Sequence, residues 1–422
     1  YRTEAVELGR MDIAAVFTNI PHKGATSFLE MLQFFRVLHY TLWAEGEYHN
    51  TIGRFDQFAY PYLKRDMEAG ILTREQAESL LEEFFLSFNW DNDTYVGVQL
   101  GDNGQSMMLG GVDEEGRDAY NLLSEMCLRA SCELKLIDPK INLRVSSDTP
   151  FERYVEGTRL TKAGLGFPQY SNDDIVIPGL MALGYDERAA RNYSVAACWE
   201  FITAGCAMDI PNIGALSYPK AVQNVLLQKL EKVNSFEELL EQVRQEIYAQ
   251  TESICADIHD LYVVPAPFYS VLMDDCIQNA RDISRGGRYN NFGIHGTGLA
   301  TAADSLEAVR IHVFEKKTVT AVQMIEAIKK DFSGYEELLH ACRYETPKMG
   351  DNIDSVDAIA AALMGWFADS LEGRKNERGG IYRAGTGSAM FYLWHANELE
   401  ASPDGRRKGE PFGTNFSPSL YV

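Results

Sequence analysis

The chain has 422 residues, 45% hydrophobic and 24% charged, which is ordinary globular composition and enough polypeptide to bury a large core. Its 61 acidic residues outnumber the 39 basic ones, and the formal charge of −22 disfavours binding to nucleic acid or to anionic lipid. No apolar run is long enough to span a membrane, and the first residues, YRTEAVELGR, lack the pattern of a signal peptide, so we expect a cytoplasmic protein.

The cysteines give no sign of a metal centre or a disulfide framework. No two of them form a C-x-x-C pair, and their count is odd. We therefore expect no bound metal, a reducing compartment and mostly small buried thiols. The cysteines are Cys127, Cys132, Cys198, Cys206, Cys255, Cys276 and Cys342.

Apolar residues recur at helical spacing through much of the chain, beginning in its N-terminal third. The stretch 27–46 has a broad apolar face, and 73–90 opens with Thr73 followed by Gln76, which is the pattern of a capping box. Further helices are predicted over 118–131, 150–164, 235–262, 301–317 and 356–374.

Short apolar runs between these helices predict buried strands. Glycines are dense in three other stretches, which favours tight turns at the ends of buried strands. Strands that alternate with long helices indicate an α/β fold, with either a parallel sheet or a barrel, in one contiguous domain. The predicted strands cover 140–146, 173–181, 193–202 and 262–273, and the glycine-rich stretches are 101–111, 285–298 and 378–389.

The familiar hydrolase, metalloprotease and nucleotide-binding motifs are missing from the sequence. The segment Cys198-Trp199-Glu200 stands out, because residues two apart in an extended backbone point to the same side. A carboxylate beside a thiol is costly to bury unless it is used, partnered or protonated. From the spacing alone, a structural role for these residues is more common than a catalytic one.

Seven segments in a fixed order carry a more specific signal. In this order and at these intervals they resemble the glycyl radical enzymes, the group that holds pyruvate formate-lyase and the glycerol, choline and hydroxyproline enzymes. The segments are GATSFLEMLQ from 24, GRFDQFAYPYLKRD from 53, LTKAGLGFPQYSNDDIVIPGL from 160, the segment around Cys198, HGTGLATAADSL from 295, GDNIDSVD from 350 and SPDGRRKGEPFGTNFSPS from 402.

The resemblance implies an α/β barrel of ten strands, built from two five-stranded halves and surrounded by helices. It implies that 1–422 is a partial barrel domain, without part of the family's N-terminal region and without the C-terminal domain that carries the radical glycine. In the family a separate radical-SAM activase installs the glycyl radical under anaerobic conditions. The expected partners are this activase, a small-molecule substrate and a second copy of the chain.

The resemblance also assigns roles to individual residues. Cys198 matches the position of the thiyl radical, and Glu200 matches the general base of the dehydratase-like branch. His49 and Asn50 match a His-Ser pair that contacts the substrate, although an Asn has a different reach from a Ser. Further expected substrate contacts are Trp199, which could instead pack the barrel, and Asp209 or Asn212, between which the sequence does not decide.

Together these residues predict a glycyl radical enzyme that eliminates water or another leaving group from a small polar substrate. Pyruvate formate-lyase has two adjacent cysteines at this site, whereas here the neighbours of Cys198 are Ala197 and Trp199. A carbon-carbon lyase that resembles formate acetyltransferase and a catalytically inactive fragment remain as alternatives. The substrate and the leaving group are left open.

Overall fold

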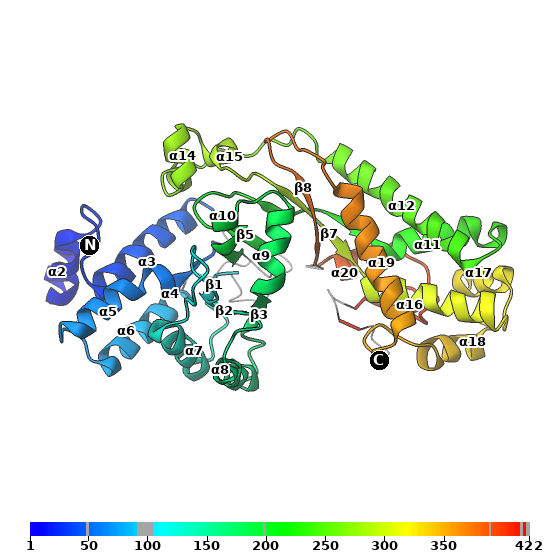
Figure 1. Cartoon of the computed structure of the whole chain (residues 1–422), viewed down its shortest axis with the longest axis horizontal. Helices are drawn as coiled ribbons and strands as arrows, with labels where there is room; N and C mark the ends of the chain where they lie inside the picture. Colours follow the sequence, from blue (N-terminus) through cyan, green and yellow to red (C-terminus); the bar gives the residue numbers. More distant parts are fainter. Residues whose placement is uncertain (48–49, 91–103, 197–199, 388–389, 414–416, 419–422) are drawn as a thin grey trace. The chain divides into compact units, whose positions relative to one another are not determined.

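The computed structural model describes residues 1–47, 50–90, 104–196, 200–387, 390–413 and 417–418. These residues form two compact units, between which the chain passes back and forth. Unit 1 consists of Tyr1–Ala207 and Ala266–Arg288, and unit 2 consists of Met208–Pro265 and Tyr289–Val422. Figure 1 shows the helices and strands of both units.

Unit 1 contains a parallel three-stranded sheet in the order β1-β2-β3 and an antiparallel pair, β4-β5. Its strands are β1 (Ser106–Gly110), β2 (Lys140–Val145), β3 (Gln169–Asn172), β4 (Tyr193–Ala196) and β5 (Glu200–Thr203). Its helices are α1 (Arg2–Glu7), α2 (Met11–Asn19), α3 (Phe28–Ala44), α4 (Phe55–Phe58), α5 (Tyr60–Glu68), α6 (Arg74–Ser87), α7 (Leu122–Leu134), α8 (Phe151–Lys162), α9 (Asp173–Ala182), α10 (Glu187–Arg191), α13 (Pro267–Ser270), α14 (Asp274–Asn279) and α15 (Ile283–Gly286).

One face of the unit 1 sheet packs on helices. Ile141, Leu143 and Val145 of β2 alternate along the strand and belong to a hydrophobic cluster with side chains of α3, α6 and α7. Because successive side chains of a strand point to opposite faces, Asn142 and Arg144 lie on the other face. The unit 1 sheet therefore has an apolar face toward the helices and a polar face away from them.

Unit 2 repeats this construction with a second parallel sheet in the order β6-β7-β8. Leu216, Phe292, Ile294 and Tyr382 from the three strands share one hydrophobic cluster with α11, α12, α16, α17 and α19. The elements are β6 (Ile210–Ser217), β7 (Phe292–Thr297), β8 (Tyr382–Thr386), α11 (Tyr218–Lys229), α12 (Phe236–Asp257), α16 (Leu299–Val309), α17 (Ala321–Lys329), α18 (Glu336–His340), α19 (Asp354–Leu371) and α20 (Phe391–Asn397), with a 3-10 turn η1 (Leu230–Lys232) and two π-helices, η2 (Arg310–Glu315) and η3 (Ala341–Glu345).

The helix predictions agree with the structure, and so does the α/β class with parallel sheets. The capping box is present, since Thr73 Oγ1 accepts from the Gln76 backbone N–H and the Gln76 side chain accepts from the N–H of Thr73. The predicted strand at 140–146 is β2, and 193–202 covers β4 and most of β5. The described residues form eight strands in three sheets, which does not test the expected total of ten.

Two strand predictions are wrong. The stretch 173–181 is helix α9, because Asn172 Oδ1 accepts from the N–H of Asp174 at 3.0 Å and so caps a helix that begins with two acidic residues. The stretch 262–273 contains no strand, and Pro267 starts the short helix α13 instead. The glycine-rich stretches contain the strands β1, β7 and β8 themselves rather than only turns at their ends. None of the helices in the described part of the chain is long and apolar enough to cross a membrane.

Candidate functional site

The β4-β5 hairpin of unit 1 carries the candidate catalytic residues. Ala196 pairs with Glu200 in the antiparallel ladder. Cys198 and Trp199 lie between β4 and β5 in the sequence and outside the described residues. Glu200 is half-buried at the first position of β5. Glu200 is thus the first described residue that follows Cys198 in the chain.

A buried ion pair holds the first strand of this hairpin. Arg144 donates from Nε to Asp173 Oδ1 at 2.7 Å and from Nη2 to Asp173 Oδ2 at 3.0 Å. The hydroxyl of Tyr193, the first residue of β4, donates to Asp173 Oδ1 at 2.7 Å, and the Arg144 guanidinium lies 4.1 Å from the centre of the Tyr193 ring. Arg144 also donates to the carbonyl of Arg191 at 2.8 Å. Since Arg144 lies on the polar face of the sheet, the hairpin packs on that face.

Arg54 is a second buried cation in this part of unit 1. It donates to the carbonyl of Gly110 at 3.0 Å. Burial and the neighbouring Arg144 lower the pKa of Arg54 to about 10. The carboxylate of Asp56 accepts from the Gly110 N–H at 2.7 Å and from Ser124 Oγ at 2.5 Å, and burial raises its pKa. Arg54 and Asp56 therefore both hold Gly110, the last residue of β1, and Asp56 also binds Ser124 of α7.

The candidate substrate-binding segment also lies in unit 1. His49 is outside the described residues, whereas Asn50 is buried and donates from Nδ2 to the carbonyl of Glu47. The next residue, Thr51, donates from Oγ1 to the carbonyl of Val195 in β4 at 2.7 Å. The structure therefore brings the Asn50 segment against the strand that leads to Cys198.

Asp209 and Asn212 belong to unit 2. Asp209 accepts from the N–H of Asn291 at 3.0 Å and from Arg383 Nη1 at 2.7 Å, and its side chain is only 3% exposed. It thereby ties the beginning of β6 to the beginning of β7 and to β8. Asn212 is exposed in the part of β6 where the register with β7 is irregular.

Sequence reasoning did not find the side chains that support these candidates. Asp173 and Arg144 are 29 residues apart, and Arg383 and Asp209 are 174 residues apart. No local sequence pattern predicts such pairs, because the geometry of the sheet, and not the distance along the chain, brings their residues together. Thr51 likewise has no motif around it.

The remaining thiols are poor candidates for chemistry. Burial raises the pKa of Cys127, Cys255 and Cys276, and it raises that of Cys342 to about 12. These four are buried, as expected of small apolar residues, while Cys132 and Cys206 are half-buried. Within the described ranges, no group of three or more His, Cys, Asp or Glu side chains could hold a metal ion.

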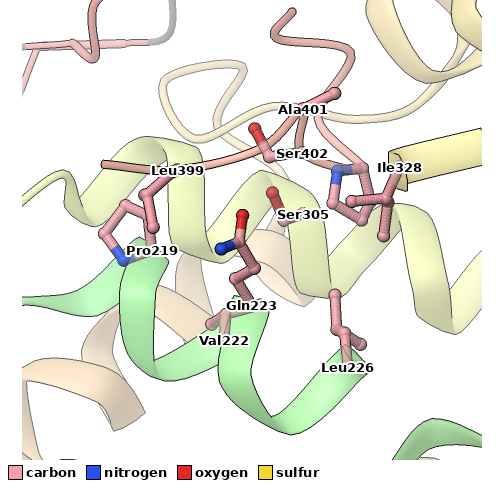
Figure 2. A pocket seen from close by; sticks show the side chains of 10 residues that line it. Pro219, Val222, Gln223, Leu226, Ser305, Ile328, Leu399, Ala401 and Ser402 are labelled. Carbon is pink, nitrogen blue, oxygen red and sulfur yellow. The ribbon is translucent and has the colours of Figure 1, made fainter. Parts of the chain in front are cut away.

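Figure 2 shows a pocket in unit 2 that is separate from these residues. Its lining has no Asp, Glu, His, Lys, Arg, Cys or Tyr side chain, so it offers no titratable group for acid-base chemistry. The lining residues are Pro219, Val222, Gln223, Leu226, Ser305, Ile328, Leu399, Ala401, Ser402 and Pro403.

Known proteins resemble this chain over nearly its whole length. The family model described as pyruvate formate lyase-like matches residues 7–395. The (2S)-3-sulfopropanediol dehydratase of Klebsiella oxytoca is 29% identical over 93% of this chain, and the match covers 51% of that relative. The chain therefore spans about half the length of the curated relatives it matches.

Solved structures agree with the sequence matches. The glycerol-bound form of the B12-independent glycerol dehydratase from Clostridium butyricum superposes with a TM-score of 0.89 at 28% identity, covering 96% of this chain and 55% of that one. A glycyl radical enzyme from Archaeoglobus fulgidus gives a TM-score of 0.89 at 27% identity, covering 99% of this chain and 58% of that one.

Proposed function

This chain belongs to the pyruvate formate lyase-like family of glycyl radical enzymes, and we propose that it forms the reaction chamber of a dehydratase or lyase. The observation that supports the proposal is the antiparallel pairing of β4 with β5, because these strands flank Cys198 in the sequence and β5 begins with Glu200. The dehydratases among the matched proteins favour elimination over acyl transfer. So does the absence of a second cysteine next to Cys198, where Ala197 and Trp199 stand.

In the proposed reaction, a thiyl radical on Cys198 takes a hydrogen atom from a substrate carbon that bears a hydroxyl group. This step forms the S–H bond, breaks the C–H bond and leaves an unpaired electron on carbon. Glu200 then accepts the hydroxyl proton, and the electron-rich carbon radical expels the leaving group from the adjacent carbon. The product radical recovers a hydrogen atom from the Cys198 thiol, which regenerates the thiyl radical. A buried chamber suits this chemistry because it keeps solvent away from the radicals.

The remaining assignments follow from the family membership. His49, Asn50 and Trp199 would contact the substrate from the segments around Cys198, and Asp209 or Asn212 would contact it from the segment that begins β6. The carboxylate of Asp209 is paired with Arg383 Nη1 at 2.7 Å. The stored radical would reside on a glycine outside these residues, installed by a radical-SAM activase. We further propose that the protein forms a homodimer and that it is located in the cytoplasm.

The test is anaerobic activation of the full-length protein by its activase, followed by electron paramagnetic resonance and turnover measurements. Glycerol and (2S)-3-sulfopropanediol serve as probe substrates. We expect a glycyl doublet, which persists in Cys198→Ala while turnover disappears. Glu200→Gln should keep the doublet and lower kcat about 10²- to 10⁴-fold, which is the usual contribution of a general base.

Cys132→Ala provides the control, because Cys132 lies on α7 and has no assigned role. It should match the wild type in both measurements. Absence of the doublet with a competent activase would refute the radical chemistry. Full turnover by Cys198→Ala would refute the assigned thiyl position, and full turnover by Glu200→Gln would refute Glu200 as the general base.

A further inference from the structure

Thr51 occupies a junction between three segments of unit 1. Its hydroxyl lies 2.7 Å from the carbonyl oxygen of Val195 in β4 and 2.9 Å from that of Ser106 in β1. The backbone N–H of Gly53 donates to the same oxygen at 3.1 Å. The hydroxyl is therefore saturated, since its one hydrogen faces two carbonyls and one lone pair is taken by Gly53.

The backbone around Thr51 is fixed to the sheet. The N–H of Ile52 donates to the carbonyl of Ser106 at 2.8 Å, and the N–H of Met108 donates to the carbonyl of Gly53 at 2.9 Å. The segment 51–53 thus runs parallel to β1 as a short extra edge. Because this backbone cannot shift easily, the bond from Thr51 to Val195 transmits the position of the sheet to the hairpin.

The segments on both sides of this junction carry residues of the candidate site. Asn50 immediately precedes Thr51, and Val195 lies three residues before Cys198 in the sequence. The ion pair of Arg144 with Asp173 holds the beginning of β4 through Tyr193, whereas Thr51 holds β4 near its end. Hydrogen-atom transfer depends steeply on the distance between sulfur and carbon, so a displaced Cys198 slows the reaction even when the radical is present.

We propose that Thr51 is a positioning residue, whose hydroxyl fixes the end of β4, the strand that leads to Cys198 in the sequence, relative to the segment at Asn50. The inference rests on the proposed function and adds to it a residue that touches neither the substrate nor the reacting atoms. The side chain acts through the carbonyl of Val195.

The test uses the activated full-length protein with Thr51→Val, which keeps the shape of the side chain and removes the hydroxyl. The glycyl doublet should form to the wild-type extent. We expect kcat for glycerol or (2S)-3-sulfopropanediol to fall about 10- to 100-fold, with a smaller change in KM. The deuterium isotope effect on kcat should rise, because hydrogen abstraction becomes slower relative to the other steps. Thr51→Ser, which restores the hydroxyl, should return kcat to within about threefold of the wild type.

Thr203→Val is the matched control in the same hairpin. Thr203 is buried in β5, and its hydroxyl has no hydrogen-bond partner among the described residues. The same chemical change at this position should leave kcat and the isotope effect at wild-type values. If Thr51→Val does not fold, Thr51→Ala is tested instead. Its smaller side chain leaves room for a water molecule that can bridge the carbonyls of Val195 and Ser106.

A second measurement needs no substrate, and it applies if the protein turns over neither glycerol nor (2S)-3-sulfopropanediol. In D₂O the thiol of Cys198 carries deuterium. A working relay transfers this deuterium to the glycyl carbon, which leaves a thiyl radical, and the thiyl radical then takes back the original hydrogen, so that the doublet becomes a singlet. We expect this conversion to slow about 10-fold or more in Thr51→Val and to recover in Thr51→Ser. Wild-type rates in Thr51→Val, or an equal loss in Thr51→Ser, would overturn the inference. Turnover that survives Cys198→Ala would instead overturn the proposed function.

Discussion

Arg144 shows how a buried charge can serve the site without reacting. Its side chain is fully buried, and that of its partner Asp173 is 4% exposed. Burying two charges away from water is costly in free energy unless each charge has a partner. Here the carboxylate of Asp173 accepts two hydrogen bonds from Arg144 and one from Tyr193. The cluster therefore fixes the start of β4 in one arrangement.

We predict that Arg144→Met lowers the free energy of unfolding by about 3–5 kcal/mol, because it leaves the Asp173 carboxylate buried without its cation. Urea unfolding followed by circular dichroism measures the change. Arg117→Met is the matched control, since Arg117 pairs with Asp113 and Glu115 while its own side chain is 73% exposed. This substitution should lower the free energy of unfolding by less than about 1 kcal/mol. Equal losses in the two variants would contradict a special role for the buried pair.

Among the elements, the strands of unit 2 explain why glycines gather in the sequence. A Cβ added at Gly293 in β7 would lie 2.0 Å from the carbonyl oxygen of Pro211 in β6. The register between these two strands is irregular at this point, so the backbones approach more closely than in a regular ladder. Gly293 is thus required by a neighbouring backbone and not by a turn.

Gly293→Ala should therefore destabilise the protein by about 2–3 kcal/mol, because backbone atoms must move to make room for the methyl group. Gly385→Ala in β8 is the comparison, since its added Cβ would meet His295 Cδ2 at 3.4 Å, an ordinary contact. It should change the free energy of unfolding by less than about 1 kcal/mol. The prediction fails in thermal unfolding experiments if the two substitutions lower the melting temperature equally.

Local signals predicted local structure well. The capping box at Thr73 needs only residues three apart, and α6 begins where it indicates. The stretch around Ile177 has the composition of a strand, but its helix depends on a cap at Asn172 that precedes the apolar run. The sequence resemblance proposes Cys198 and Glu200 as site residues, yet it could not reveal Thr51, since its bond to Val195 joins residues 144 positions apart.

For the whole molecule, the two units have separate hydrophobic cores, and each unit also holds histidines and a buried aspartate whose pKa values are shifted: His39 and Asp56 in unit 1, and His312, His395 and Asp404 in unit 2. In unit 1 the pKa of His39 falls to about 4, because of burial and the nearby Arg36, while the backbone of Asn50 acts in the opposite direction. Burial raises the pKa of Asp56 in unit 1 and of Asp404 in unit 2.

In unit 2, His312 lies on the π-helix η2. Its Nδ1 is 2.9 Å from Thr318 Oγ1, and its Nε2 is 3.1 Å from Thr346 Oγ1. Burial and Lys316 lower the pKa of His312, Lys348 adds to this, and Glu345 opposes it. A neutral ring therefore joins the end of η2 to the end of η3.

The sign of the pH effect follows from these shifts. His39 and His312 bind protons less readily when folded than when unfolded, so their contribution to stability is present above their unfolded pKa of 6.5 and is lost as the pH falls toward the folded pKa. For His39 the full loss by about pH 4 is roughly 3 kcal/mol. The two aspartates act oppositely, because a raised folded pKa contributes stability that is present below the unfolded pKa and is lost as the pH rises.

We predict that each histidine makes its own unit sensitive to acid. Hydrogen exchange resolved by peptide, and corrected for the intrinsic rate, should show protection in α3 and α6 falling between pH 6.5 and 4 in the wild type. His39→Gln should flatten this dependence in unit 1 and leave that of α16 and α19 in unit 2 unchanged. His312→Gln should flatten the dependence in unit 2 except for the part that His395 contributes, and it should leave unit 1 unchanged, because residues in separate cores with no shared partners contribute independently. If His39→Gln flattens the dependence in both units to the same degree, the two cores unfold as one cooperative body.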